Sequence, residues 1–218
     1  SPRRGSWRAR CTATPLPPAR LPAPHPTATP TATPAQDSGW TLHEGPGFSV
    51  SLPEDWQVQA MDEAKAAALF ESLRRTDPHL AGIVSSPEAI RASVLLAFAP
   101  PDGPGFTDNA SIRRMPLSGQ EVADLQGTVT AVRAELGKLG FSVLSAESDL
   151  RMADVPAARL ISATSGRTAA GETVDLRTHQ YLVATRDDLW ILAYTTVADR
   201  EETMRPVFEQ SAATFRPE

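Results

Sequence analysis

The chain has 218 residues, 41% of them hydrophobic, and a formal net charge of -5 at pH 7. This length suits one domain of ordinary size with an additional segment. No apolar run approaches the roughly eighteen residues that a membrane-spanning helix needs. The chain beyond residue 38 is acidic and has no basic stripe. We therefore expect no nucleic-acid partner, because Lys and Arg side chains that neutralise phosphates supply most of the affinity of proteins for nucleic acids.

Residues 1–38 differ from the rest in composition. Nine of the twenty prolines lie there, and five arginines against one aspartate give the segment a charge of +4. Residues 12–36 are almost entirely Thr, Pro, Ala and Leu, so they lack the apolar surface that offsets ordering entropy, and their prolines favour an extended conformation. We predict a disordered Pro/Thr-rich leader and spacer over 1–38, with a truncated signal region as one interpretation of its basic start, and a single globular domain over 39–218.

The only cysteine, Cys11, directly precedes this spacer. A cysteine followed by a low-complexity spacer and a domain resembles a bacterial lipoprotein, in which acyl chains on the cysteine anchor the protein. The preceding residues Arg8, Ala9 and Arg10 do not match a lipobox, which has an apolar residue three positions before the cysteine. Lipidation of Cys11 and an incidental cysteine in a disordered leader therefore both remain open. A single cysteine excludes an intramolecular disulfide.

Alternation and capping signals divide the domain into strands and helices. Phe48, Val50 and Leu52 alternate with serines, which is typical of a half-buried strand, and Pro53 ends it because proline cannot donate to a ladder. In chain order we then expect Trp56 and Val58 to continue the alternation, a helix at 61–78 capped by Asp62, a short helix from Ser86, a central strand at 92–100 and a strand from about Asn109 to Met115.

The clearest helix follows the capping box Ser118-Gly-Gln-Glu121 and stops at Gly140. Its apolar residues recur at spacings of three and four: Val122, Leu125, Val129, Val132, Leu136 and Leu139. Such a stripe usually packs on a sheet, although a partner-binding face has the same pattern.

Four strands and a helix complete the domain. The strands are expected at 141–147, 156–164, 173–185 and 189–197, the last two as a hairpin. The final helix is capped by Asp199 with Glu202 and is kinked or split at Pro206. This order predicts an α+β fold, an antiparallel β-sheet flanked by α-helices.

Several stretches resemble the PsbP-like superfamily. They are GFSVSLPEDWQV at 47–58, DNASI at 108–112, VPAARL at 155–160 and the ending at 189–216. The resemblance covers about residues 40–216 and implies a PsbP-like α/β/α sandwich with a non-enzymatic binding or assembly role. The matching residues are strand edges and core positions, so they specify a fold better than a function.

We find no catalytic constellation in the sequence. Nucleophile-elbow, phosphate-loop, dinucleotide and zinc motifs are absent, so no catalytic, cofactor-binding or metal-binding residue is predicted. The histidines His25, His43, His79 and His179 are scattered and are expected at the surface. Carboxylates such as Glu201 and Glu202 are expected to satisfy helix-start amides or to be solvated. Trp190, Tyr194 and Phe208 are expected in the core, whereas Trp40 either packs on a sheet edge or marks a ligand cleft.

The leading hypothesis is a non-enzymatic secreted or lipid-anchored envelope protein, acting as a protein-binding or assembly module. The alternative is a small-ligand or lipid carrier with a pocket between sheet and helices, and an enzyme ranks third. We expect an unknown protein or envelope component as partner, no cofactor, membrane contact only through the N-terminal tether, and a monomer.

Overall fold

The computed structural model describes residues 39–62, 64–65, 67–68, 71, 93–101, 106–117, 124–168 and 171–218. The chain divides into residues 1–35 and 36–218, and all described residues belong to the second unit. Several predictions lie outside the described residues: the spacer with Cys11, most of the helix at 61–78, the helix from Ser86 and the capping box at 118–121.

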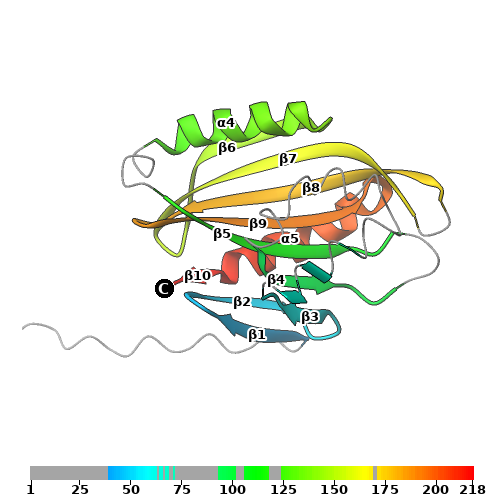
Figure 1. Ribbon diagram of the computed structural model, residues 1–218, viewed down its shortest axis with the longest axis horizontal. Helices are drawn as coiled ribbons and strands as arrows, with labels where there is room; N and C mark the ends of the chain where they lie inside the picture. The colour runs from blue at the N-terminus through cyan, green and yellow to red at the C-terminus, as the bar shows by residue number, and fades with distance from the viewer. Residues whose placement is uncertain are drawn as a thin grey trace, which may run out of the picture. The chain divides into compact units, whose positions relative to one another are not determined.

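Seven antiparallel strands form a large sheet in the order β3-β4-β5-β9-β8-β7-β6 (Figure 1). The strands are β3 (Gln57–Ala60), β4 (Ser93–Phe98), β5 (Asn109–Pro116), β6 (Ser142–Met152), β7 (Val155–Arg167), β8 (Thr173–Ala184) and β9 (Asp188–Val197). All of them were predicted, with β6 and β7 longer than expected, and β4 lies inside the sheet between β3 and β5. The β8–β9 hairpin is confirmed, with Ala184 paired to Leu189 beside its turn.

A second, three-stranded sheet was not predicted. It consists of β1 (Trp40–Gly45), β2 (Phe48–Pro53) and β10 (Arg216–Pro217), in the order β1-β2-β10. β1 and β2 form a hairpin around Pro46 and Gly47, and Gly47 has a φ of 82°, in the left-handed region that favours glycine. The small sheet therefore joins strands from the two ends of the domain.

Helix α4 (Leu125–Lys138) begins at Leu125, where Asp124 accepts a 2.7 Å hydrogen bond from the Gly127 amide. That bond makes Asp124 the N-cap of the described helix. The predicted stop is confirmed, since Gly140 has a φ of 83°. Val129 and Leu136 of the predicted stripe are buried, and Leu125 and Val132 pack against the same core, so this part of the stripe packs on the sheet, whereas Leu139 is 39% exposed.

The last helix, α5 (Glu201–Thr214), follows a 3-10 turn, η2 (Ala198–Arg200). The cap predicted from Asp199 and Glu202 is wrong, because the residue before α5 is Arg200 and its side chain makes no capping bond. The 3-10 turn satisfies an amide at the start of α5 instead, since the Glu201 amide donates to the Ala198 carbonyl. Pro206 lies inside one continuous helix, so the predicted split does not occur.

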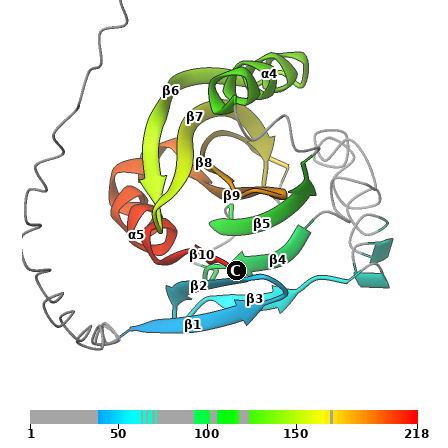
Figure 2. The same cartoon turned by 90° about the vertical axis from the view of Figure 1, so that its left-hand side faces the viewer.

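Helices cover both faces of the large sheet, so the predicted α+β fold is confirmed (Figure 2). One face packs against α4 through a core that includes Leu160, Leu182 and Ile191. The opposite face packs against α5 and the small sheet. Its core contains the predicted residues Trp190, Tyr194 and Phe208, of which Phe208 stacks on Tyr194 with ring centroids 5.2 Å apart.

Hydroxyl groups connect this core to the small sheet. The Ser211 hydroxyl of α5 donates to the Ser51 carbonyl at 2.8 Å and lies 3.0 Å from the Tyr194 hydroxyl. The single hydroxyl proton of Ser211 is used in its hydrogen bond to the Ser51 carbonyl. Tyr194 is therefore the donor, and Ser211 the acceptor, in the bond between the two hydroxyls. The Ser51 amide in turn donates to the Thr214 hydroxyl at 2.7 Å. Two α5 side chains thus bind both backbone groups of Ser51, as a neighbouring strand would.

Candidate functional site

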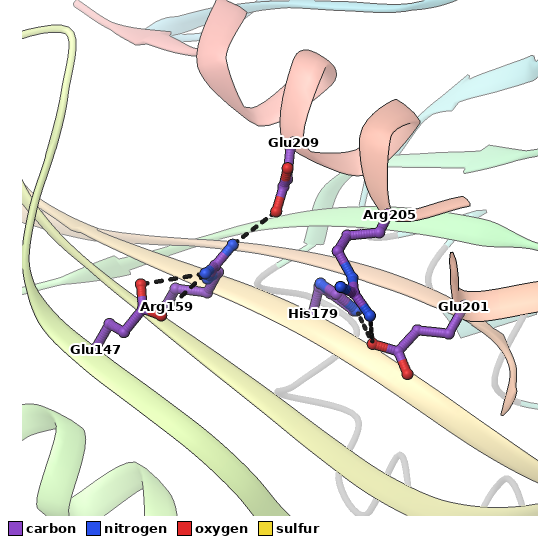
Figure 3. Close-up of polar contacts among 6 residues, drawn as sticks. All are labelled: Glu147, Arg159, His179, Glu201, Arg205 and Glu209. Carbon is purple, nitrogen blue, oxygen red and sulfur yellow. Dashed lines mark hydrogen bonds and ion pairs between the residues drawn. The ribbon is translucent and has the colours of Figure 1, made fainter. Parts of the chain in front are cut away.

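A cluster of charged side chains lies between the large sheet and α5 (Figure 3). Strand alternation places Arg177 and His179 of β8 on the same face, and sheet register places Glu147 of β6 opposite Arg159 of β7. Three residues of α5 at a spacing of four lie on one face of the helix, toward the sheet. They are Glu201, Arg205 and Glu209 (Figure 3).

His179 and Glu201 form the inner half of the cluster. His179 Nε2 lies 3.2 Å from Glu201 Oε1, which also accepts from Arg205 at 3.1 Å. The other carboxylate oxygen lies 3.8 Å from Arg177 Nε. His179 is 0% exposed, and its ring meets Phe208 edge-on. Glu201 is therefore shared by two arginines and a buried imidazole.

Burial lowers the pKa of His179 and outweighs the opposing effect of Glu201. The imidazole is thus neutral near pH 7, and its hydrogen bond to the carboxylate requires the proton on Nε2. The other ring nitrogen, Nδ1, is buried and has no hydrogen-bond partner among the described residues. Protonation would place an unsatisfied N–H donor there, which is a second reason for the neutral form.

Arg159 forms the outer half of the cluster. Its guanidinium donates to Glu209 at 2.8 Å and to the two oxygens of Glu147 at 3.0 and 3.2 Å. Arg159 thereby ties β6 and β7 to α5. Tyr181 lies opposite Arg159 in the sheet, and burial raises the pKa of its hydroxyl.

This arrangement is suited to holding α5 on the sheet rather than to proton transfer. A general base must reach its substrate, whereas His179 has no exposed surface and each carboxylate already has an arginine partner. The described residues contain no group of three or more His, Cys, Asp or Glu that could hold a metal ion. Among these residues, no helix is long and apolar enough to cross a membrane.

Two predictions about this cluster were wrong. His179 was expected at the surface, and Glu201 was expected to satisfy backbone amides or to be solvated, but they bind each other. The reason is that α5 docks across β8, a long-range contact that local spacing does not reveal. His43, by contrast, is partly exposed on β1. Asn109 begins β5 as expected, and its amide donates to the Thr107 carbonyl.

The outer side of β1 is a second candidate, which we call the β1 edge surface and define as Trp40, Leu42 and Glu44. Phe48, Val50 and Leu52 of β2 point into the core, so the β1 residues opposite their neighbours Ser49, Ser51 and Pro53 point away from it. Leu42 is 47% exposed and Trp40 is partly exposed. Trp40 thus lies on an edge strand, which agrees with the first of its two predicted interpretations, packing on a sheet edge.

The free edge of β1 differs from the other sheet edges. Among the described strands β1 pairs only with β2, in an unbroken register over six residues. The edge strand β6 carries two register shifts, and the edge strand β3 has four residues. Bulges and short strands discourage pairing with another chain. β1 has neither protection, so it offers a regular edge beside an exposed leucine.

The fold and these two features define an antiparallel α+β sandwich with a structural ion cluster and, among the described strands, the unbroken free edge of β1. A scan against models of known protein families matches none of them, and a search of curated protein sequences finds no match. Solved structures similar to this chain include cyanobacterial PsbP from Synechocystis, with 11% identity and a TM-score of 0.48 over 86% of this chain and 98% of that one.

Two further structures are similar over most of the domain. LpqN, involved in cell envelope biogenesis of Mycobacterium tuberculosis, has 14% identity and a TM-score of 0.49 over 81% of this chain and 88% of that one. The immunity protein TplEi of Pseudomonas aeruginosa has 10% identity and a TM-score of 0.44 over 83% and 98%. A PsbP protein, from the superfamily that the sequence resembles, is among the solved structures that are similar to this chain in fold.

Proposed function

We propose that this chain is a non-enzymatic, extracytoplasmic binding module, lipid-anchored at Cys11, whose β1 edge surface docks an envelope protein. The observation that carries the docking proposal is the regular free edge of β1 with Leu42 47% exposed. A partner strand added there would gain main-chain hydrogen bonds from the edge and an apolar contact from Leu42. The role is distinct from catalysis because the charged cluster is internally paired and His179 is enclosed.

The sequence around Cys11 supports the location. Cys11 directly precedes a Pro/Thr tract that would hold the domain away from the headgroups. Fractionation and intact mass of the protein from its native host test this part. We expect a diacylated chain in the membrane fraction and release of the Cys11→Ser variant. An unmodified chain in the cytosolic fraction would overturn the anchoring and the location.

Site-specific photo-crosslinking tests the docking. A photoreactive amino acid replaces Leu42 in one variant and Leu144 in a matched control, because both leucines lie on edge strands and Leu144 is 56% exposed. We expect a discrete crosslinked adduct in the native envelope from position 42 and none from position 144. Equal adducts from both positions, or none from position 42, would contradict docking at the β1 edge surface.

A further inference from the structure

The free edge of β1 presents a regular set of backbone groups at the outer side of the small sheet (Figure 1). The Glu54 amide donates to the Gly39 carbonyl at 2.9 Å, so the backbone of Gly39 points toward β2. In an antiparallel pair, successive residues point their backbone groups alternately toward the partner strand and away from it. The groups that point away from β2 are therefore those of Trp40, Leu42 and Glu44, the residues of the β1 edge surface.

This set of outward backbone groups has defined ends. The next outward position after Glu44 is Pro46, which has no N–H to donate. At the other end, Gly39 has a φ of 102°, which departs from the extended conformation of a strand. A partner strand can therefore use three outward residues of β1, with Leu42 in the middle.

The edge is complementary to itself in an antiparallel arrangement. If a two-fold axis passes beside Leu42, this residue faces Leu42 of the second copy, and Trp40 faces Glu44 of the second copy. In this register alone, every outward residue of β1 faces an outward residue of the other copy. A shift by two residues places Trp40 opposite Pro46, or Glu44 beyond the end of the other strand. Each of the facing pairs exchanges two N–H···O bonds.

The side chains fit the same register. Leu42 would lie diagonally beside Trp40 of the second copy, so that apolar side chains from both copies form one continuous patch on the outer face. The two Glu44 carboxylates would lie at opposite ends of the paired strands and would not face each other. On the inner face Thr41 would pair with His43, and burial lowers the pKa of His43, so this pair is uncharged near pH 7. No charge therefore meets its like.

The other sheet edges do not invite further copies. Among the described strands, β10 has two residues, β3 has four, and β6 carries two register shifts. A two-fold contact uses the β1 edge of both copies at once, so the assembly closes at two. We propose that this chain forms a symmetric homodimer in which two β1 strands pair antiparallel about Leu42. This inference departs from the monomer expected from the sequence. It does not rest on the docking role, although a docked protein and a second copy would compete for the same edge.

Disulfide crosslinking of the purified full chain, with Cys11 replaced by serine, tests the register. The two Cα atoms at Leu42 would lie about 5.5 Å apart, within the range of about 4.4–6.8 Å usual for a disulfide. We expect Leu42→Cys to give a crosslinked dimer on mild oxidation. Trp40→Cys and Glu44→Cys should each fail to crosslink alone, because each position lies about 14 Å from its counterpart. Mixed in equal amounts, these two variants should crosslink with each other.

Sedimentation velocity over a concentration series measures the association itself. Leu42→Lys should weaken the dimer at least about tenfold, because it removes the central apolar contact and sets two like charges opposite each other. Leu144→Lys is the matched control and should associate as the wild type does, since Leu144 is 56% exposed on the edge strand β6. An equal mixture of Leu42→Lys and Leu42→Glu should regain a dimer.

Two results would overturn the proposal. One is a wild-type chain that sediments as a monomer at every concentration up to about 1 mM. The other is Trp40→Cys alone crosslinking as readily as Leu42→Cys, which would mean that the strands do not pair about Leu42. Both measurements use purified protein, so they are separate from the test of docking in the native envelope, where an adduct of twice the chain mass identifies the dimer.

Discussion

Ser211→Ala should destabilise the domain far more than its change in volume suggests. Ser211 is 1% exposed, donates to the Ser51 carbonyl and accepts from the fully buried Tyr194 hydroxyl. Alanine leaves a buried acceptor and a buried donor without partners, and each costs about 1–3 kcal/mol. Because Ser51 is only partly buried, we expect a total loss of about 2–4 kcal/mol in the free energy of unfolding, against a typical total of about 5–15 kcal/mol.

Equilibrium urea unfolding, followed by tryptophan fluorescence, measures this loss. Tyr194→Phe should cost less, because Ser211 still donates to Ser51 in that variant. In the Tyr194→Phe background, Ser211→Ala leaves only the Ser51 carbonyl unpaired, so the double-mutant cycle should give a coupling of about 1–2 kcal/mol between the two hydroxyls. A loss below about 0.5 kcal/mol for Ser211→Ala, or additive effects of the two substitutions, would refute the assigned hydroxyl chain.

Three further predictions use the same unfolding assay. Phe208→Ala should cost about 3–5 kcal/mol, because Phe208 is fully buried and stacks on Tyr194; a loss under about 1 kcal/mol would contradict its core position. Asp124→Ala should cost about 1 kcal/mol, since the Gly127 amide loses its acceptor, and Asp124→Asn should retain most of the stability. The wild type should lose stability as the pH falls below about 6.5, because burial lowers the pKa of His179 in the folded state and the unfolded chain then binds more protons. His179→Gln should reduce that pH dependence, and an unchanged slope would show that another group is responsible.

Local patterns predicted the large sheet well because its strands are long and strongly apolar. The β8–β9 hairpin, for example, contains the fully buried Leu182, Trp190 and Leu192, which lie in two almost continuous apolar runs separated by a short polar turn. The apolar stripe of α4 was predicted equally well from its spacing. Its capping residue Asp124 was not predicted, because the sequence Ser118–Glu121 further upstream matches the capping-box pattern better.

The small sheet and the ion cluster could not be predicted in the same way. β1 carries only Trp40 and Leu42 as large apolar side chains, although the Pro46-Gly47 turn before Phe48 is a hairpin signal that points to it. β10 has two residues, too few for any periodicity. The pairing of His179 with Glu201 depends on where α5 crosses β8, which is set by tertiary packing.

The small sheet imposes an order on biosynthesis. β2 is made early, but its second neighbour, β10, and the two α5 hydroxyls that bind Ser51 lie more than 150 residues later. Until those last residues have been synthesised, the side chains of Phe48, Val50 and Leu52 cannot pack against α5. The side of β2 that pairs with β10 also remains without a partner strand. A nascent chain thus exposes an apolar, aggregation-prone strand segment, β2, for most of its synthesis. We expect this chain to need a holding chaperone in transit, one that recognises the segment around β2 and releases it only when the C-terminal residues arrive.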